Sequence, residues 1–158
     1  MLKQPHLFPH GFHLTSFPLG EDLKTFVREK NWSALDERFK SLTHPSGELF
    51  NFLHAFHDFS TIEFIISIRD ANDEWEEDGI WHDDGSRVFA FSLSLTEHPE
   101  KIQGGVLGIR RKGTEVMQEI PTPAFGEIIL FLTGPHGYEH KIHQVKEGQR
   151  IIIAGWCS

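Results

Sequence analysis

The sequence has 158 residues, of which 39% are apolar and 12% aromatic, enough for one domain with a sizeable buried core. Its formal charge of -8 repels phosphate backbones, so a nucleic-acid partner is not expected. The single cysteine, Cys157, cannot form an internal disulfide, and there is neither a signal-peptide core nor an apolar run long enough to span a bilayer. We therefore expect a cytoplasmic protein that does not enter a membrane.

Residues 20–57 show the residue spacing of amphipathic helices. Leu23 and Phe26 share one helical face, and apolar residues continue at helical spacing through Leu42. Proline is common at the first position of a helix, so Pro45 predicts the start of a third helix. We expect these helices to pack their apolar faces on a sheet.

From residue 60 onward the apolar period shortens from about 3.6 to about 2 residues, which predicts strands. The alternation is clear over residues 62–69 and 88–95, with a polar loop over residues 70–79 between them. Further strands are expected at Val106–Arg110, Thr114–Ile120, Glu127–Leu132 and Arg150–Trp156. Short strands that follow helices at this regular spacing predict an antiparallel sandwich or barrel buttressed on one side. Small residues at Ser92, Ser94 and Ala154 are candidates for the wall of a pocket.

Two distant segments carry the side chains that best suit a metal site. On a strand, residues two apart project to the same face, so His82 and Asp84 would offer an imidazole and a carboxylate to one ion while Asp83 points away. His140 would complete a facial set of three ligands and leave positions open for a cosubstrate and oxygen. Arg150, ten residues past His140, would add a guanidinium that suits the carboxylate of an organic anion.

These residues also carry a family resemblance. The distal segment matches the arrangement His-x-Val-x-x-Val-x-x-Gly-x-Arg, with conservative replacements, at His140, Ile142, Val145, Gly148 and Arg150. The run Gly104-Gly105-Val106-Leu107 looks like a Gly-Gly-x-Leu turn of the same family. From about residue 62 to residue 158 the chain resembles the Fe(II)- and 2-oxoglutarate-dependent oxygenases, in particular the prolyl 4-hydroxylase-like group.

The resemblance implies a fold and a domain plan. The fold would be mainly β with N-terminal helices: a double-stranded β-helix, also called a jelly roll and cupin-like, buttressed by helices. Residues 1–158 would form a single domain. Within it, residues 20–57 would be helical support and residues 60–158 the jelly-roll catalytic core.

The resemblance also assigns roles to the site residues. His82, Asp84 and His140 would bind Fe(II), and Arg150 would hold the far carboxylate of the cosubstrate 2-oxoglutarate. His143 competes as the third ligand on metal chemistry alone, but its spacing of seven residues to Arg150 does not fit the family pattern. The implied reaction is hydroxylation of an unidentified substrate, a protein side chain such as proline or a small molecule, with release of succinate and CO2.

The chain departs from the family in the residues that help to hold 2-oxoglutarate, and Ile152 stands where some relatives have a hydroxyl two residues after the Arg. Relatives often use a Tyr or Asn before the His-x-Asp motif to help hold 2-oxoglutarate, whereas the only tyrosine here is Tyr138 and the available asparagine is Asn72. Two other functions stay open at this point. One is a non-catalytic jelly-roll module that binds a metal or ligand, and the other is a cupin-like metalloenzyme that does not use 2-oxoglutarate.

Overall fold

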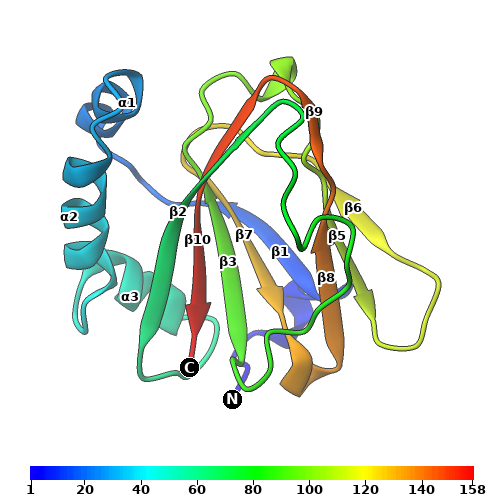
Figure 1. Cartoon of the computed structure of the whole chain (residues 1–158). Helices are drawn as coiled ribbons and strands as arrows, with labels where there is room; N and C mark the ends of the chain where they lie inside the picture. The colour runs from blue at the N-terminus through cyan, green and yellow to red at the C-terminus, as the bar shows by residue number, and fades with distance from the viewer.

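The computed structural model describes all 158 residues as two main antiparallel sheets with helices beside the larger one (Figure 1). The helices are α1 (Glu21–Arg28), α2 (Trp32–Thr43) and α3 (Glu48–His54), with single 3-10 turns at η1 (Pro5–Leu7), η2 (Pro99–Lys101) and η3 (Gly134–His136). None of these helices is long and apolar enough to cross a membrane.

The larger sheet has the strand order β1-β7-β3-β10-β2. Its strands are β1 (Phe12–Ser16), β2 (Ile62–Asp70), β3 (Phe89–Ser94), β7 (Glu127–Leu132) and β10 (Gln149–Cys157). The smaller sheet has the order β6-β5-β8. It consists of β5 (Leu107–Arg111), β6 (Gln118–Ile120) and β8 (Tyr138–Ile142), and a separate ribbon pairs β4 (Gln103–Gly104) with β9 (Val145–Glu147).

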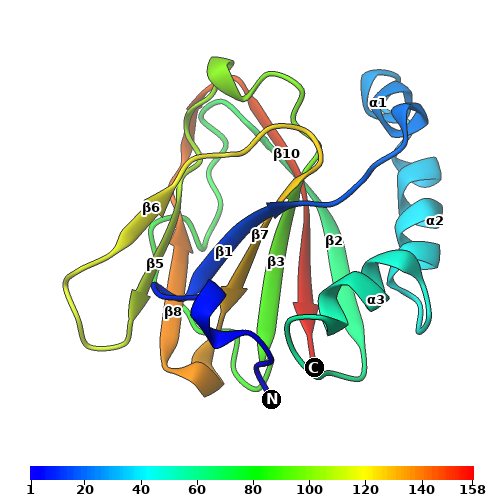
Figure 2. The same cartoon turned by 180° about the vertical axis from the view of Figure 1, so that it is seen from behind.

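The helices cover the β2 side of the larger sheet, as Figures 1 and 2 show. Helix α2 begins where the side chain of Asn31 accepts a hydrogen bond from the N–H of Ala34 at 3.2 Å. Leu35 and Phe39 of its apolar stripe are fully buried, and the ring centroid of Phe39 lies 6.1 Å from that of Phe64 on β2. The predicted helical support over residues 20–57 is therefore present and lies on a sheet, as expected.

The larger sheet separates two environments. On β2, the face that carries Phe64 packs against the helical layer, while the opposite face carries Ile65, Ser67 and Arg69 toward a cavity. The central strand β3 is buried at every position because it is covered on both faces. This arrangement places the cavity between residues of the larger and the smaller sheet.

Two local predictions differ from the structure. The third helix starts at Glu48 rather than at Pro45, because Ser46 takes a left-handed conformation (φ 75°) and forms a turn first. The strand expected from Thr114 is reduced to β6, since the turn at Gly113 extends through Thr114, whose hydroxyl donates to the carbonyl of Arg111. Strands β1 and β8 were not predicted and are formed by pairing with β7 and β5.

Candidate metal centre and anion pocket

Backbone pairing brings the two histidines together. His140 lies on β8, and the short segment at His82 pairs with it, each N–H donating to the carbonyl of the other residue at 2.9 Å. Their ring centroids are 4.1 Å apart. His82 Nδ1 lies 3.2 Å from the carbonyl oxygen of Ile80, which favours the proton on Nδ1 and leaves a lone pair on Nε2 for a ligand.

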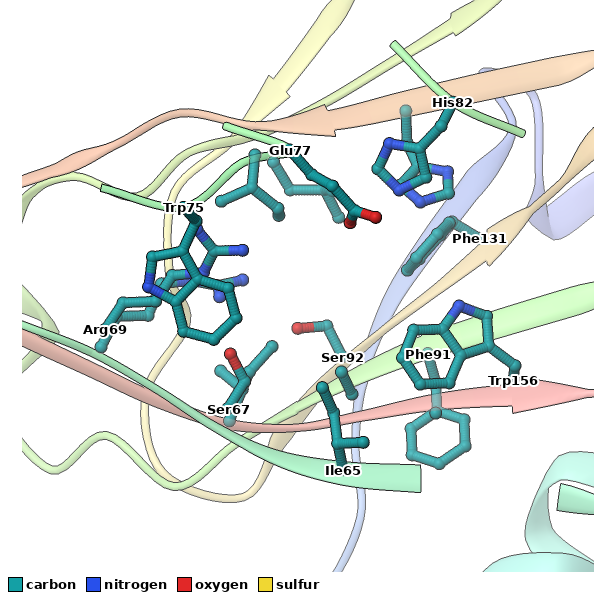
Figure 3. Close-up of a pocket in the computed structure, with 17 residues that line it drawn as sticks. Ile65, Ser67, Arg69, Trp75, Glu77, His82, Phe91, Ser92, Phe131 and Trp156 are labelled. Atoms are coloured by element: carbon teal, nitrogen blue, oxygen red, sulfur yellow. The ribbon is translucent and has the colours of Figure 1, made fainter. Parts of the chain in front are cut away.

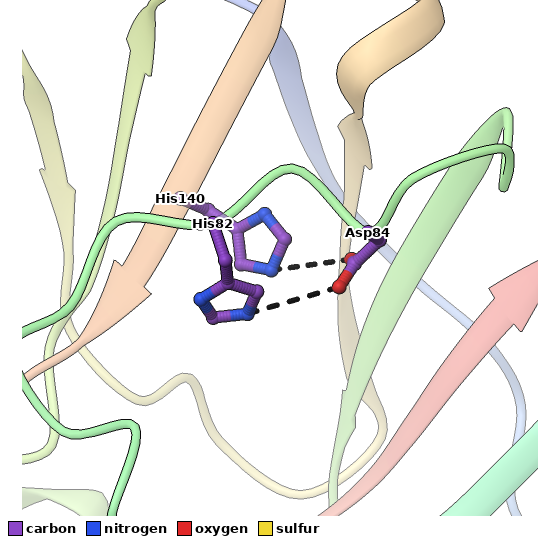
Figure 4. A group of neighbouring side chains, drawn as sticks. All are labelled: His82, Asp84 and His140. Carbon is purple, nitrogen blue, oxygen red and sulfur yellow. Dashed lines mark ion pairs between the residues drawn. The ribbon is translucent and has the colours of Figure 1, made fainter.

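Asp84 reaches the histidines by a turn and not by strand alternation, so the predicted parity argument is wrong in its local geometry. The residue has a left-handed backbone (φ 62°), which aspartate tolerates better than most residues. Its carboxylate then lies 3.2 Å from His140 Nε2 and 3.7 Å from His82 Nε2 (Figure 4). The Nε1–H of Trp156 donates to the same carboxylate at 3.1 Å, while Asp83 points away and pairs with Lys112.

The protonation states suit a cation. One ligand atom from each of His82, Asp84 and His140 lies within 4.8 Å of the others. Burial lowers the pKa of His140 to about 3, so its imidazole is neutral at neutral pH and forms no salt bridge with the nearby carboxylate. Burial also raises the pKa of Asp84, although the charge of His82 opposes this shift. A bound cation would offset the cost of burying that carboxylate.

Arg150 begins the buried part of β10 and has only 2% of its surface exposed. Its Cδ atom would lie 3.0 Å from a Cβ added at Gly105, which has a φ of 63°. A Cβ at Gly104 would collide with the carbonyl oxygen of Gln144. The predicted Gly-Gly turn is therefore the place where the backbone passes close beside the arginine.

Arg150 has no carboxylate partner, and its Nε atom is buried without a hydrogen bond. Burial, and secondarily the neighbouring Arg69, lower the pKa of Arg150 to about 9, so the guanidinium is still charged at neutral pH. A buried, unpaired cation is costly unless an anion completes it. The side chain is thus suited to hold an anionic ligand.

His82, His140 and Arg150 line one cavity of about 130 Å³ (Figure 3), and Asp84 lies beside the two histidines. Ser92 of β3 and Ala154 of β10 contribute to its wall, as expected from their small size. The Ser92 hydroxyl is buried without a partner. Ser94 does not line the cavity, and its hydroxyl donates instead to the carbonyl of Pro123 at 2.7 Å.

Four residues that line the same cavity are not evident from the sequence: Ser67, Arg69, Trp75 and Glu77. The first two lie on the inward face of β2, and their shared strand parity is the signal that would have grouped them. The other two come from the polar loop over residues 70–79. Nothing in the order of residues shows that this loop folds back over the cavity.

Three residues that the sequence analysis considered for the site lie outside the cavity wall and the metal-binding group. Asn72 is exposed in a turn (φ 65°), where its N–H donates to the carbonyl of Val145. Tyr138 is buried beside the guanidinium of Arg111, 4.7 Å from the ring centroid, and is not part of the cavity wall. His143 does not join the group formed by the other histidines and Asp84. The geometry therefore brings His140, and not His143, to the candidate centre.

Comparison with known proteins adds independent information. The model of the 2OG-Fe(II) oxygenase superfamily matches residues 66–158, which is more than half of the chain. A PKHD-type hydroxylase of Prochlorococcus marinus strain MIT 9515 is 29% identical over 119 residues, which is 75% of this chain and 49% of that protein. The chain thus spans about half the length of this relative.

Solved structures share the fold. A crystal structure of a Pseudomonas putida prolyl-4-hydroxylase has a TM-score of 0.62 at 18% identity and covers 98% of this chain and 92% of its own. A prolyl hydroxylase from Trichoplax adhaerens has a TM-score of 0.59 at 14% identity, with coverage of 99% and 87%. These similarities confirm the predicted jelly-roll fold with N-terminal helices. The chain belongs to the 2OG-Fe(II) oxygenase superfamily, and its fold resembles that of the solved prolyl-4-hydroxylase.

Proposed function

We propose that this chain is an Fe(II)- and 2-oxoglutarate-dependent hydroxylase. In this proposal His82, Asp84 and His140 hold the iron, and Arg150 holds the far carboxylate of 2-oxoglutarate. The observation that carries the proposal is that three ligand groups converge, and that two of them, His82 and His140, line the same cavity as a buried guanidinium without an acid partner. A metal-binding site alone would not explain the buried cation.

The donor set fits Fe(II). Two imidazoles and one carboxylate from three residues are the ligands of the facial iron sites of oxygenases, which leave further positions open. The neutral state of His140 is the state that binds a metal, because a protonated imidazole has no free lone pair there. The superfamily takes Fe(II) as cofactor and 2-oxoglutarate as cosubstrate, in agreement with this donor set.

When bound, the iron would supply the redox chemistry that couples decarboxylation of 2-oxoglutarate, to succinate and CO2, to hydroxylation of a substrate C–H bond. The protein's own residues position the reactants. Trp156 fixes the carboxylate of Asp84 by its indole N–H, and Ile80 fixes the ring of His82. Arg150 would orient the cosubstrate by two parallel hydrogen bonds to one carboxylate.

The cavity wall would exclude water from the reacting atoms. Leu107, Phe131 and Ile152 are buried and line the cavity that His82, His140 and Arg150 also line. Ile65 and Trp75 also line it but remain 47% and 37% exposed, so they mark its solvent side. We place substrate entry on this side, where an apolar ligand surface would cover both side chains.

We also propose a broad substrate class, a domain organisation and a cellular compartment. The substrate would be a protein side chain such as proline, or a small molecule, and the two solved relatives named as prolyl hydroxylases favour a proline-containing peptide as the first test. Residues 1–158 would act as one domain, with residues 20–57 as support and residues 60–158 as catalytic core. The lone buried thiol of Cys157 suits a reducing compartment, so we propose the cytoplasm.

Succinate release tests the proposal. Iron-loaded protein would be incubated in air with 2-oxoglutarate, with and without proline-containing peptides, and succinate would be measured. We expect release by the wild type, loss to background in His140→Ala, and retention in the matched control His143→Ala. A binding module would release no succinate, and a cupin-like enzyme of another type would turn over without 2-oxoglutarate. Either result would contradict the proposal.

A further inference from the structure

We infer that Arg69 is a second carboxylate-binding residue of the pocket, and that Arg69 and Arg150 together form a two-guanidinium clamp for the far carboxylate of 2-oxoglutarate. This inference rests on the proposed function and deepens it. It also predicts a strong selection for oxo acids that carry a second carboxylate.

The first argument is the strand register. Arg69 on β2 lies directly opposite Arg150 on β10, and both side chains line the cavity. Like charges at directly opposed positions of an antiparallel pair destabilise a sheet. Arg69 is 8% exposed and Arg150 is 2% exposed, so water does little to screen them. Two opposed and buried arginines are a costly arrangement for a role in packing alone.

The second argument is the count of charges and partners. Arg69 pairs with Asp78, whose side chain is also largely buried, whereas Arg150 has no acid partner. Ion pairing with the protein therefore neutralises only one of the two arginines, because Glu77, which also lines the cavity, is exposed and forms an ion pair with neither of them. Four polar atoms of cavity-lining residues are buried without a hydrogen bond: Nδ1 of His140, and the donors Nε of Arg69, Nε of Arg150 and Oγ of Ser92. A carboxylate is an anion with acceptor atoms for such donors.

The third argument is that Arg69 is held in place. Trp75 stacks on its guanidinium, with 4.0 Å between the guanidinium carbon and the ring centroid, and Asp78 pairs with it from the same loop. Figure 3 shows Arg69 and Trp75 at the opposite end of the cavity from His82. The cavity thus has a metal-binding end and a cationic end, which matches a ligand with a chelating oxo acid at one end and a carboxylate at the other.

The experiment compares two oxo acids. 2-Oxoglutarate and 2-oxopentanoate have the same chelating end and chain length, but only 2-oxoglutarate has the far carboxylate. Each would be titrated anaerobically into iron-loaded protein, with the visible absorption of the chelate as the readout. We expect Arg69→Gln to weaken the binding of 2-oxoglutarate by about tenfold or more, as for the loss of a hydrogen bond to a charged group. The affinity for 2-oxopentanoate should be unchanged.

Two further variants control for effects on folding. Arg69→Gln combined with Asp78→Asn removes the acid that would otherwise be left unpaired, and it should show the same selective loss. Arg110→Gln is the matched control, because Arg110 also pairs with a carboxylate, Glu139 at 2.8 Å, and stacks on a tryptophan, Trp81 at 3.9 Å, but lies outside the cavity. We expect it to bind both oxo acids like the wild type.

A second readout does not need the metal. Glutarate should raise the melting temperature of the metal-free wild type, because a ligand that binds only the folded state stabilises it. The increase in melting temperature should be smaller in Arg69→Gln. Equal weakening of both oxo acids would show that Arg69 only braces the loop and would overturn the clamp. If Arg69→Gln bound both oxo acids with unchanged affinity while Arg150→Ala lost 2-oxoglutarate binding, the role of Arg69 would be overturned and the role of Arg150 would stand. A wild type that binds no 2-oxoglutarate would overturn the proposed function itself.

Discussion

At the scale of single residues, the candidate site depends on two backbone conformations that most residue types avoid. Asp84 turns its carboxylate back to the imidazoles in a left-handed conformation, and Gly105 lets the backbone pass beside Arg150. The sequence alone could not predict either backbone conformation. The residue types were informative all the same, because Asp and Gly are types that tolerate a positive φ.

The substitution Gly105→Ala tests the close approach to Arg150. The left-handed conformation would cost about 1–3 kcal/mol with a side chain present. In addition, the new Cβ would lie 3.0 Å from Arg150 Cδ and displace the guanidinium. We expect lower stability in chemical denaturation and weaker 2-oxoglutarate binding in anaerobic titration.

Gly113→Ala is the matched control for this prediction. Gly113 also has a positive φ, 79°, but a Cβ there would have no atom within 4 Å. We expect a similar loss of stability with unchanged affinity for 2-oxoglutarate. Equal loss of affinity in both variants would mean that backbone strain, and not contact with Arg150, controls binding.

At the scale of elements, the sequence predicted those whose residue pattern is regular. The helical spacing of residues 20–57 and the alternation in β2 and β3 correspond to observed structure, and β7 and β10 were also expected as strands. β1 and β8 escaped prediction because five-residue strands with mixed side chains give little periodicity and depend on their partners. Arg69 escaped as a site residue because its register with Arg150 joins strands eighty residues apart. By contrast, the spacing to Arg150 was enough to select His140, which the structure groups with His82 and Asp84.

Helix α2 should stabilise the sheet without forming the site. Phe39 is fully buried against β2, and Phe39→Ala should lower the free energy of unfolding by about 3–5 kcal/mol through cavity formation. Ser41→Ala, at an exposed position of the same helix, should change it by less than about 0.5 kcal/mol. Urea denaturation measures both. At low temperature the folded Phe39→Ala protein should bind 2-oxoglutarate normally, and a loss there would show that the helices shape the cavity.

The segment after α3 should make stability depend on pH. His57 is buried, and its Nε2 lies 2.7 Å from Nε2 of His136 on η3. Burial lowers the pKa of both residues below the ordinary value of 6.5, and the Met1 amino group opposes their charge, although Asp58 favours it at His57. The unfolded chain therefore binds protons more readily, so stability is complete above about pH 6.5 and falls as the pH drops below it.

A series of urea denaturations between about pH 7 and pH 5.5 measures this dependence. In His57→Phe, which places an apolar ring beside Phe89, the slope of stability with pH should be smaller. An unchanged slope would mean that other groups carry the acid sensitivity.

At the scale of the whole molecule, an acidic protein encloses a cavity with two arginines at one end. The chain has a formal charge of -8, yet two arginines face each other inside it and only one has an acid partner. The larger sheet supplies both arginines and the smaller sheet supplies His140, so the site exists only when the two sheets are assembled. Loss of the site and loss of the fold should therefore coincide in any variant that separates the sheets.

Absorption spectroscopy of the anaerobic protein with Fe(II) and 2-oxoglutarate tests the central claim most directly. The wild type should develop a visible charge-transfer band that disappears when a chelator removes the iron. His82→Ala should show no band, because the metal loses one of its three ligands, and Arg150→Ala should need a higher 2-oxoglutarate concentration to develop it. Absence of the band in fully iron-loaded wild type, or an undiminished band in His82→Ala, would contradict the assignment of this site.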